Sequence, residues 1–335
     1  MPSGPGTLLA EVAEHSDVGS LMTAVRDTLR AWIGAGPVFL ASADPVTGAF
    51  TGTYTFDVPD DAAAAFFAIE IAGRDVVSFG ALSGSDTPLG SLFAATHATP
   101  ALSERWRNVI SPLGWGDELR AAVRRDGSTW GYLCLHREAS ERPFAARELA
   151  RLGALLPAIA AAMRTAELSS QKDSARLGTG VVLVDHRCRV AGLTGAAEAW
   201  LDEMGPRRPD GLPLVLAGLT RLVLDGGLPV SSTITTRTGR VGQVDAAVLQ
   251  HLCEPQVAVV ISAAPAGHQL DRLAAASGLS GREREIVSCV LAGMSTRAIA
   301  DHLTISAHTV QAHLTSVFSK TGMRSRRELV SRLTR

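Results

Sequence analysis

The first half of the chain combines a helical and a strand-like pattern of apolar residues. One helical face is marked by apolar residues spaced three or four apart: Leu21, Val25, Leu29 and Trp32. Short apolar runs at 38–42 and 50–56 predict strands, and residues 118–124 and 129–135 predict a hairpin. Apolar residues at helical spacing then predict a helix over 144–168. This mixture predicts an α+β domain.

A second mixed pattern occupies the middle of the chain. Residues 180–184 read as a strand and residues 196–204 as a helix rich in alanine and leucine. Further strands are expected at 230–236, 244–249 and 257–262. We therefore expect a second α+β domain, and residues 263–269, with Pro265 and Gly267, are expected to form a linker.

After that linker the pattern becomes helical, and three helix starts follow one another. Ser280 precedes Glu283 by three residues, the spacing of a capping box in which each side chain bonds the other residue's backbone amide. Gly293 is suited to ending that first helix, Ser295 to capping a second and Ser306 to capping a third. The sequence therefore predicts an all-α C-terminal domain.

The third of these helices has two chemically different faces. Its inward face is apolar and comprises Val310, Leu314, Val317 and Phe318. Its outward face is small and polar and comprises Ala307, His308, Gln311, Ala312 and Thr315. A helix that enters the major groove of DNA, about 12 Å wide, needs a surface without bulky or acidic side chains. The pattern favours a recognition helix.

The charge of the chain is unevenly distributed. The net charge is −1, but residues 268–335 contain ten basic and five acidic residues, against 22 and 28 in the rest of the chain. A basic segment on an otherwise acidic chain is expected when one domain binds a polyanion. The charge pattern and the helix pattern therefore point to the same partner, double-stranded DNA.

The ordered motifs of residues 270–335 resemble the LuxR/GerE type of helix-turn-helix, a four-helix domain. The resemblance is carried by Leu279-Ser280-x-Arg282-Glu283, Gly293-Met294-Ser295, Ile299-Ala300, Leu303-x-Ile305-Ser306-x-x-Thr309-Val310-x-x-His313 and Lys320-x-Gly322. It implies a transcriptional regulator that binds an inverted-repeat operator as a homodimer. RNA polymerase is then a candidate partner.

The resemblance also implies roles for single residues. Contacts to the DNA backbone are expected from Thr296, Arg297, Ser306, Thr309 and Lys320, and base contacts from His308, Gln311, Ala312 and Thr315. Ser306 can instead serve only as a helix cap, and His313 is expected to pack at a helix interface. The final helix, with Leu329, Val330 and Leu333, resembles the dimerisation element of this domain type.

Two positions depart from that family's usual residues. Gln311 stands where a lysine is common, and Thr321 stands where a leucine is common. Loss of a cation weakens contacts to phosphate or guanine, whereas glutamine can pair with adenine through two hydrogen bonds. We therefore expect Gln311 to alter which operator is bound without abolishing DNA binding.

The two upstream segments resemble sensor domains. Residues 15–168 resemble a GAF domain through the strand Gly131-Tyr132-Leu133-Cys134-Leu135 and the closing helix that follows Phe144 and Glu148. Residues 175–264 resemble a degenerate PAS-type fold. The resemblance implies a small-molecule effector, for which Trp106, Trp115 and Trp130 are candidate ligand-binding residues, although aromatic residues beside a sheet are more often part of the core.

Two other functions compete with a ligand-responsive regulator. The upstream domains could form a ligand-free scaffold for dimerisation, or one of them could be an enzyme. No G-x-S-x-G or H-E-x-x-H motif is present, and the adjacent acidic pair Asp60 and Asp61 is expected in a loop. We predict no catalytic residues, no metal site and no cofactor.

The remaining composition favours a cytoplasmic protein. The four cysteines, Cys134, Cys188, Cys253 and Cys289, form no C-x-x-C pair, so buried free thiols are expected. The first residues have no basic segment ahead of an apolar run, unlike a secretory signal. The longest apolar stretch, 152–163, is short for a membrane span and contains Pro157.

Overall fold

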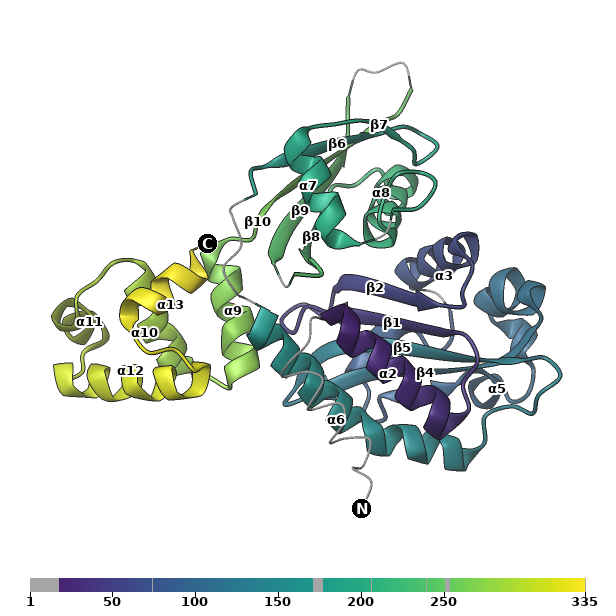
Figure 1. Cartoon of the computed structure of the whole chain (residues 1–335), viewed down its shortest axis with the longest axis horizontal. Coiled ribbons are helices and arrows are strands. Elements are labelled where there is room, and N and C mark those ends of the chain that lie inside the picture. The colour runs from purple at the N-terminus through teal and green to yellow at the C-terminus, as the bar shows by residue number, and fades with distance from the viewer. Residues whose placement is uncertain are drawn as a thin grey trace.

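The computed structural model describes residues 18–73, 75–170, 177–205, 207–238, 240–250 and 254–334. Within these ranges two sheet domains are followed by a group of helices (Figure 1). Each sheet is antiparallel and five-stranded, in the orders β2-β1-β5-β4-β3 and β7-β6-β10-β9-β8. The expected organisation, two α+β parts and an all-α C-terminal part, is confirmed at this level, whereas the specific GAF and PAS assignments stay predictions.

The first sheet is covered on both faces. Its strands are β1 (Val38–Ala43), β2 (Phe50–Phe56), β3 (Leu89–Ser91), β4 (Trp115–Arg125) and β5 (Ser128–Glu138). Helices α2 (Val18–Ile33) and α6 (Ala146–Ser170) pack on one face, where they share an apolar core with strand residues such as Leu119 and Leu133. The expected helices and the hairpin are confirmed, but Trp32 is 48% exposed and does not join the core face of α2.

Shorter helices cover the opposite face of the first sheet. They are α3 (Asp60–Ala72), α4 (Phe79–Gly84) and α5 (Leu92–Ala95), followed by the 3-10 turn η1 (Pro100–Leu102), the π-helical turn η2 (Trp106–Ile110) and the 3-10 turn η3 (Ser111–Leu113). The expectation that Asp60 and Asp61 lie in a loop is wrong, because both belong to the first turn of α3. The alanine run after them favours helix.

The second sheet domain has a separate apolar core. Its strands are β6 (Gly180–Val184), β7 (Val190–Leu193), β8 (Val230–Thr235), β9 (Val241–Val248) and β10 (Val257–Ala263), with helices α7 (Gly195–Met204) and α8 (Leu214–Gly226). Trp200 of α7 is fully buried and donates its indole N–H to the Gly178 carbonyl at 3.0 Å. Helix α8 was not predicted, but the four expected strands and α7 are confirmed.

The C-terminal helices form a third apolar core. They are α9 (Ala266–Ser277), α10 (Gly281–Leu291), α11 (Thr296–Leu303), α12 (Ala307–Thr321) and α13 (Arg326–Leu333). The expected linker over 263–269 is wrong in its second half, since α9 begins at Ala266 with Pro265 as its N-cap. Proline is tolerated at a helix start because the first backbone amides have no partner within the helix.

Among the residues that the structure describes, one helix is long and apolar enough to cross a membrane by length and composition, the 146–166 part of α6. The apolar stretch 152–163, expected to be too short for a span, is the central part of this longer helix. In the structure α6 packs against α2 and β4 and contributes Leu152, Leu156 and Ile159 to the first core. It is the core helix of a folded domain.

Candidate nucleic-acid interface and sensory sites

The helix-turn-helix geometry is built by local capping. Ser280 and Glu283 form the expected capping box at the start of α10, and Gly293 adopts a φ of 80° after its end. Ser295 caps α11 and Ser306 caps α12, each accepting a hydrogen bond from a backbone amide three residues on. Thr304 joins α11 to α12 in the left-handed conformation, with a φ of 55°.

The outward face of α12 lies in solvent. His308, Gln311, Ala312 and Thr315 are all exposed, while Val310, Leu314 and Val317 are buried against α10 and α11. The Thr315 hydroxyl donates to the backbone carbonyl of Gln311 at 3.0 Å. The side-chain amide of Gln311 can both donate and accept hydrogen bonds. The structure thus brings the four predicted base-contact residues together on one exposed surface.

The predicted backbone-contact residues are placed in three different settings. Arg297 is exposed and Thr296 partly exposed, both in the first turn of α11. Ser306 and Thr309 lie in the first turn of α12 and bond each other, with 2.8 Å between their hydroxyl oxygens. Ser306 also accepts from the Thr309 amide at 3.0 Å, so its capping role is present in the structure.

Lys320 lies in a third setting, as the partner of a buried carboxylate. Its ammonium nitrogen lies 3.0 and 2.7 Å from the two carboxylate oxygens of Glu283, whose side chain is only 5% exposed. Burial opposes ionisation of Glu283, but hydrogen bonds from Lys320, Ser316 and Ser280 outweigh it and lower the pKa of Glu283 to about 2. Lys320 therefore ties the end of α12 to the start of α10.

Sequence reasoning did not foresee the arginines that brace this domain. Arg282 donates to the Leu303 carbonyl at 2.9 Å, and Arg326 donates to the Met294 carbonyl. The first contact joins the start of α10 to the end of α11, and the second joins the start of α13 to the turn between α10 and α11. The exposed Arg324 and Arg327 lie beside Arg326 at the start of α13. No pattern in the sequence separates the bracing arginine from its solvated neighbours.

The predicted dimerisation residues do not share one surface. Leu329 and Leu333 are 0% and 1% exposed and belong to the core of the helix-turn-helix region, whereas Val330 is partly exposed. A partner helix could therefore meet Val330 but not the two leucines. The helical spacing had identified the apolar face of α13 without showing that this face is already covered by α9 and α10.

The three candidate tryptophans of the first domain lie apart from one another. Trp130 packs in the core beneath α2 and α6, while Trp115 and Trp106 pack on the opposite face of the sheet. The cavity beside Trp130 measures only about 20 Å³, about enough for one water molecule. Trp115 stacks on His136 with 4.4 Å between ring centroids. The three side chains therefore do not line one pocket.

A buried charged cluster lies on the same face as Trp115. We call it the Glu118 cluster; it comprises Glu70, Asp75, Arg105, Glu118, Arg120 and His136. Arg105 bonds Glu118 and Asp75 at 2.8 and 3.0 Å, and Arg120 bonds Glu70 at 2.6 Å. Glu118 and His136 face each other across β4 and β5. Burial lowers the pKa of His136 to about 4, so its ring is neutral near pH 7.

Several polar atoms in the Glu118 cluster are buried without a hydrogen-bond partner. They are one carboxylate oxygen of Glu118, the Nε of Arg120 and the Nδ1 of His136. The Arg120 Nε and the unpartnered Glu118 oxygen are 3.9 Å apart, a separation that one bridging acceptor and donor can span. Buried polar atoms normally form hydrogen bonds, so these unused donors and acceptors could bind a small polar molecule, including water.

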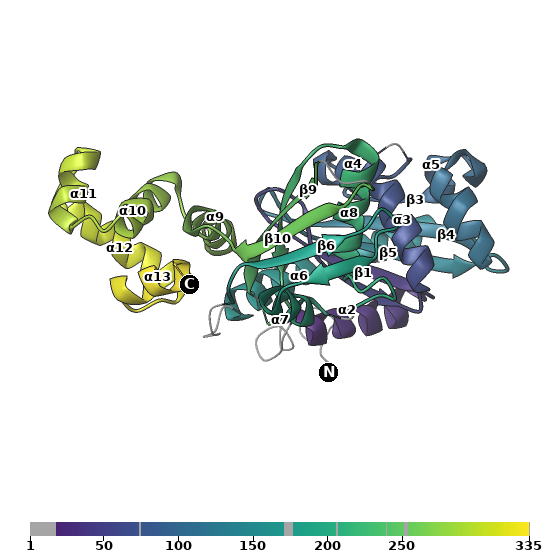
Figure 2. The same cartoon turned by 90° about the horizontal axis from the view of Figure 1, so that it is seen from above.

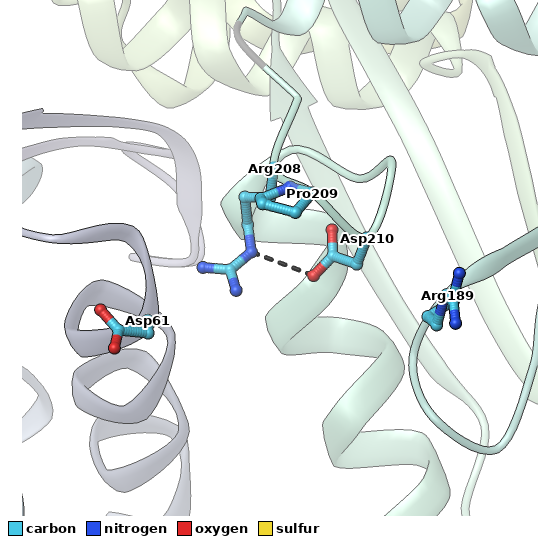
Figure 3. Close-up of a pocket in the computed structure, with 5 residues that line it drawn as sticks. All are labelled: Asp61, Arg189, Arg208, Pro209 and Asp210. Atoms are coloured by element: carbon cyan, nitrogen blue, oxygen red, sulfur yellow. Dashed lines mark hydrogen bonds and ion pairs between the residues drawn. The ribbon is translucent and has the colours of Figure 1, made fainter.

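A larger pocket lies where the two sheet domains approach. It measures about 560 Å³ and is lined by Asp61 of α3 and by Arg189, Arg208, Pro209 and Asp210 of the second domain (Figure 3). Arg208 and Asp210 pair at 3.0 Å within it. Its volume is in the range of small-molecule sites, but none of the three candidate tryptophans lines it.

The described residues contain free cysteines but no cluster of metal-binding side chains. Among the described residues no group of three or more His, Cys, Asp or Glu side chains could hold a metal ion. Cys134 and Cys289 are buried free thiols, as expected, but Cys188 is partly exposed. Cys253 lies outside the described residues.

Comparison with known proteins identifies the C-terminal region. Residues 277–333 match the GerE family model, described as bacterial regulatory proteins of the luxR family. The monoamine regulon transcriptional regulator of Klebsiella aerogenes is 50% identical over 54 residues, which are 16% of this chain and 24% of that protein. An HTH-type transcriptional regulator of Mycobacterium bovis is 44% identical over 57 residues, 17% of this chain and 6% of its own. The chain thus spans a quarter or less of these relatives.

Two solved structures show weaker similarity. SdiA of Escherichia coli is 11% identical with a TM-score of 0.37, over 98% of this chain and 95% of its own. The VqmA–ligand–DNA complex of Vibrio cholerae is 17% identical with a TM-score of 0.24, over 47% of this chain and 82% of its own.

Proposed function

We propose that this protein is a DNA-binding transcriptional regulator of the LuxR type, acting in the cytoplasm. The single observation that carries the proposal is the exposed face of α12, free of carboxylates and held on a capped helix-turn-helix. The luxR-family match over residues 277–333 covers the same elements. RNA polymerase is the partner expected for such a regulator.

We assign specific contacts within this proposal. His308, Gln311, Ala312 and Thr315 read bases, and Thr296, Arg297, Ser306 and Thr309 contact the backbone of the DNA. Lys320 is assigned a different role from the one its position in the motif implies. Because Glu283 holds its ammonium group, Lys320 fixes the angle between α12 and α10 and contributes little to phosphate binding.

Two copies of the chain are proposed to bind an inverted repeat. The two-fold symmetry of a dimer requires a pseudo-palindromic site, and the separation of its two recognition helices sets the half-sites about one turn of DNA apart. The exposed side of α13 around Val330 is the proposed contact between the copies. The proposed division of the chain is 15–168 and 175–264 for the sensory domains and 270–335 for DNA binding.

A small polar effector is proposed to act on the first domain. The unpartnered atoms of Glu118, Arg120 and His136 support this assignment, because such atoms are costly unless a bound molecule satisfies them. The competing function, a ligand-free scaffold, predicts no stabilisation by any small metabolite. A thermal-shift screen separates the two: a polar metabolite that raises the melting temperature favours a sensor, and no shift across the screen favours a scaffold.

The DNA-binding proposal is tested through Gln311. We expect genomic footprinting to find a bipartite inverted repeat for the native chain and lower occupancy for Gln311→Ala, since a bidentate pair with adenine contributes about 1 to 3 kcal/mol. Ser288→Ala, an exposed position on α10, is the matched control and should leave occupancy unchanged. Equal occupancy for Gln311→Ala would remove Gln311 from the reading face.

A further inference from the structure

All three parts of the molecule meet at one buried carboxylate, Asp44. It begins the turn between β1 and β2 and is 0% exposed. One carboxylate oxygen accepts hydrogen bonds from the Val46 and Thr47 amides at 2.9 and 3.0 Å, which stabilise the turn. The local backbone therefore occupies only half of the carboxylate, and the second oxygen is directed out of the first domain.

The second oxygen of Asp44 binds groups from the other two parts. It accepts from the Thr233 hydroxyl of β8 at 3.0 Å, and from His268 Nε2 and Arg272 Nη1 of α9 at 2.7 and 2.8 Å. Arg272 also donates to the Thr235 hydroxyl at 3.0 Å. We call this set the Asp44 junction. Side chains that lie between 189 and 228 residues away in the sequence thus meet at one oxygen of Asp44.

The charges in the Asp44 junction are removed from water. The side chains of Asp44 and Arg272 are 0% and 1% exposed. Burial opposes ionisation of Asp44, but His268, Arg272 and the amides of its own turn outweigh it and hold its pKa well below the usual range. A buried ion pair leaves an uncompensated charge when one partner is lost, so the junction is either complete or strongly disfavoured.

Helix α9 connects this junction to the DNA-binding region. Leu270 and Leu273 belong to the apolar core of that region, whereas Ala276 belongs to the core of the first domain beside α6. Figures 1 and 2 both show α9 between the remaining C-terminal helices and the sheet domains. Any rearrangement of the sheet domains at Asp44 must therefore move α9, and with it α10 to α13.

We propose that the Asp44 junction is a regulatory latch, which holds the helix-turn-helix in one orientation and transmits changes in the sheet domains to it. The two arrangements of the latch are closed, with the Asp44 oxygen bonded to His268 and Arg272, and open, with α9 released from the first domain. A discrete element with two arrangements is what coupling between distant sites requires. The effect on DNA rests on the proposed function, but the latch itself does not.

Hydrogen–deuterium exchange of the full-length chain tests the latch without DNA. Asp44→Asn keeps an oxygen for the Val46 and Thr47 amides but turns an N–H donor toward His268 and Arg272. We expect amide exchange in 266–274 to rise at least tenfold in Asp44→Asn and in Arg272→Met, while exchange in α12 changes less than twofold. Unchanged exchange in 266–274 would overturn the proposal.

Two further variants serve as a control and as a second test of the latch. Arg284 pairs with Asp271 of α9, and their side chains are 55% and 29% exposed. Because so exposed an ion pair contributes little, Arg284→Met should leave exchange in 266–274 within twofold of the native chain. His268→Ala removes a partner that is 19% exposed and is expected to raise exchange in 266–274 at least threefold in a folded chain. If Asp44→Asn fails to fold, His268→Ala becomes the deciding variant. Faster exchange in 266–274 of His268→Ala supports the latch, and unchanged exchange overturns it.

DNA binding then separates the latch from the proposed function. The probes are two duplexes selected by the full-length protein from a random pool, one with two half-sites and one cut down to a single half-site. We expect Asp44→Asn to lower affinity for the paired duplex at least threefold and to leave the single half-site within twofold, because only the paired duplex requires a fixed orientation. Equal changes on both duplexes would overturn control by the latch, whereas absent DNA binding with altered exchange would overturn only the proposed function.

Discussion

At the scale of single residues, the role of a charged side chain in this protein is decided by its partner. Lys320 and Arg297 both belong to the basic C-terminal segment, yet Lys320 bonds a buried carboxylate while Arg297 is exposed. Sequence reasoning assigned both to the DNA backbone, because the motif gives positions and residue types but no partners. Glu283 was identified as part of a capping box, and its second role as the partner of Lys320 requires a contact 37 residues away.

This pairing predicts a pH dependence. The pKa of Glu283 is about 2 in the folded chain against 4.5 ordinarily, so its stabilisation is complete above about pH 4.5 and is lost as the pH falls toward 2. We expect Glu283→Gln, which keeps the capping-box geometry, to destabilise the C-terminal region by roughly 1 to 2 kcal/mol at pH 7, allowing for the solvent around Lys320, and by almost nothing near pH 2.

Urea titrations at pH 2, 5 and 7, followed by the methyl resonances of Ile286 and Ile299 in that core, measure the difference. Glu285→Gln on the same helix is the control, since its ion pair with Arg282 is 57% exposed on the carboxylate side. A Glu283→Gln effect of the same size at all three pH values would contradict a role for the charge.

At the scale of elements, periodicity predicted the helices and strands whose apolar faces are regular and missed those fixed by contacts. The hairpin β4–β5, helix α6 and the three capped helices follow from turn residues, caps and spacing. Helices α8 and α9 both begin after a proline N-cap, Pro213 and Pro265; Pro265 was interpreted as part of a linker, and no element was predicted after Pro213. The apolar face of α13 was recognised, but the helices that cover it are a property of tertiary packing.

Close packing of elements gives a second stability prediction. Strand β5 lies so near β1 and α6 that a Cβ at Gly131 would meet the Ala41 carbonyl oxygen at 2.5 Å and the methyl group of Met163. Since a backbone carbonyl cannot move aside cheaply, we expect Gly131→Ala to destabilise the first domain by about 3 kcal/mol. Gly192→Ala in β7, where a Cβ meets nothing within 4 Å, should change stability by less than about 1 kcal/mol. Thermal unfolding followed by tryptophan fluorescence compares the two; equal effects would refute the packing argument.

At the scale of the whole molecule, the near-zero net charge conceals a basic C-terminal end, the proposed DNA-binding region, on an acidic body. Binding should therefore depend steeply on salt even though the chain is almost neutral, because each neutralised phosphate releases counterions and adds about −0.9 to the slope of log K against log salt. We expect Arg297→Ala to reduce the steepness of this slope by about 1 per protomer on a selected duplex, measured by fluorescence anisotropy between 50 and 300 mM KCl.

The control for this prediction lies on the acidic body. Arg221 of α8 is exposed and pairs with Asp225, so Arg221→Ala removes the same charge at a site remote from α12 and should leave the slope unchanged. If both variants reduced the slope equally, the salt dependence would arise from the field of the entire chain. If only Arg297→Ala does so, the salt dependence arises from local contacts of the helix-turn-helix and not from the summed charge of the chain.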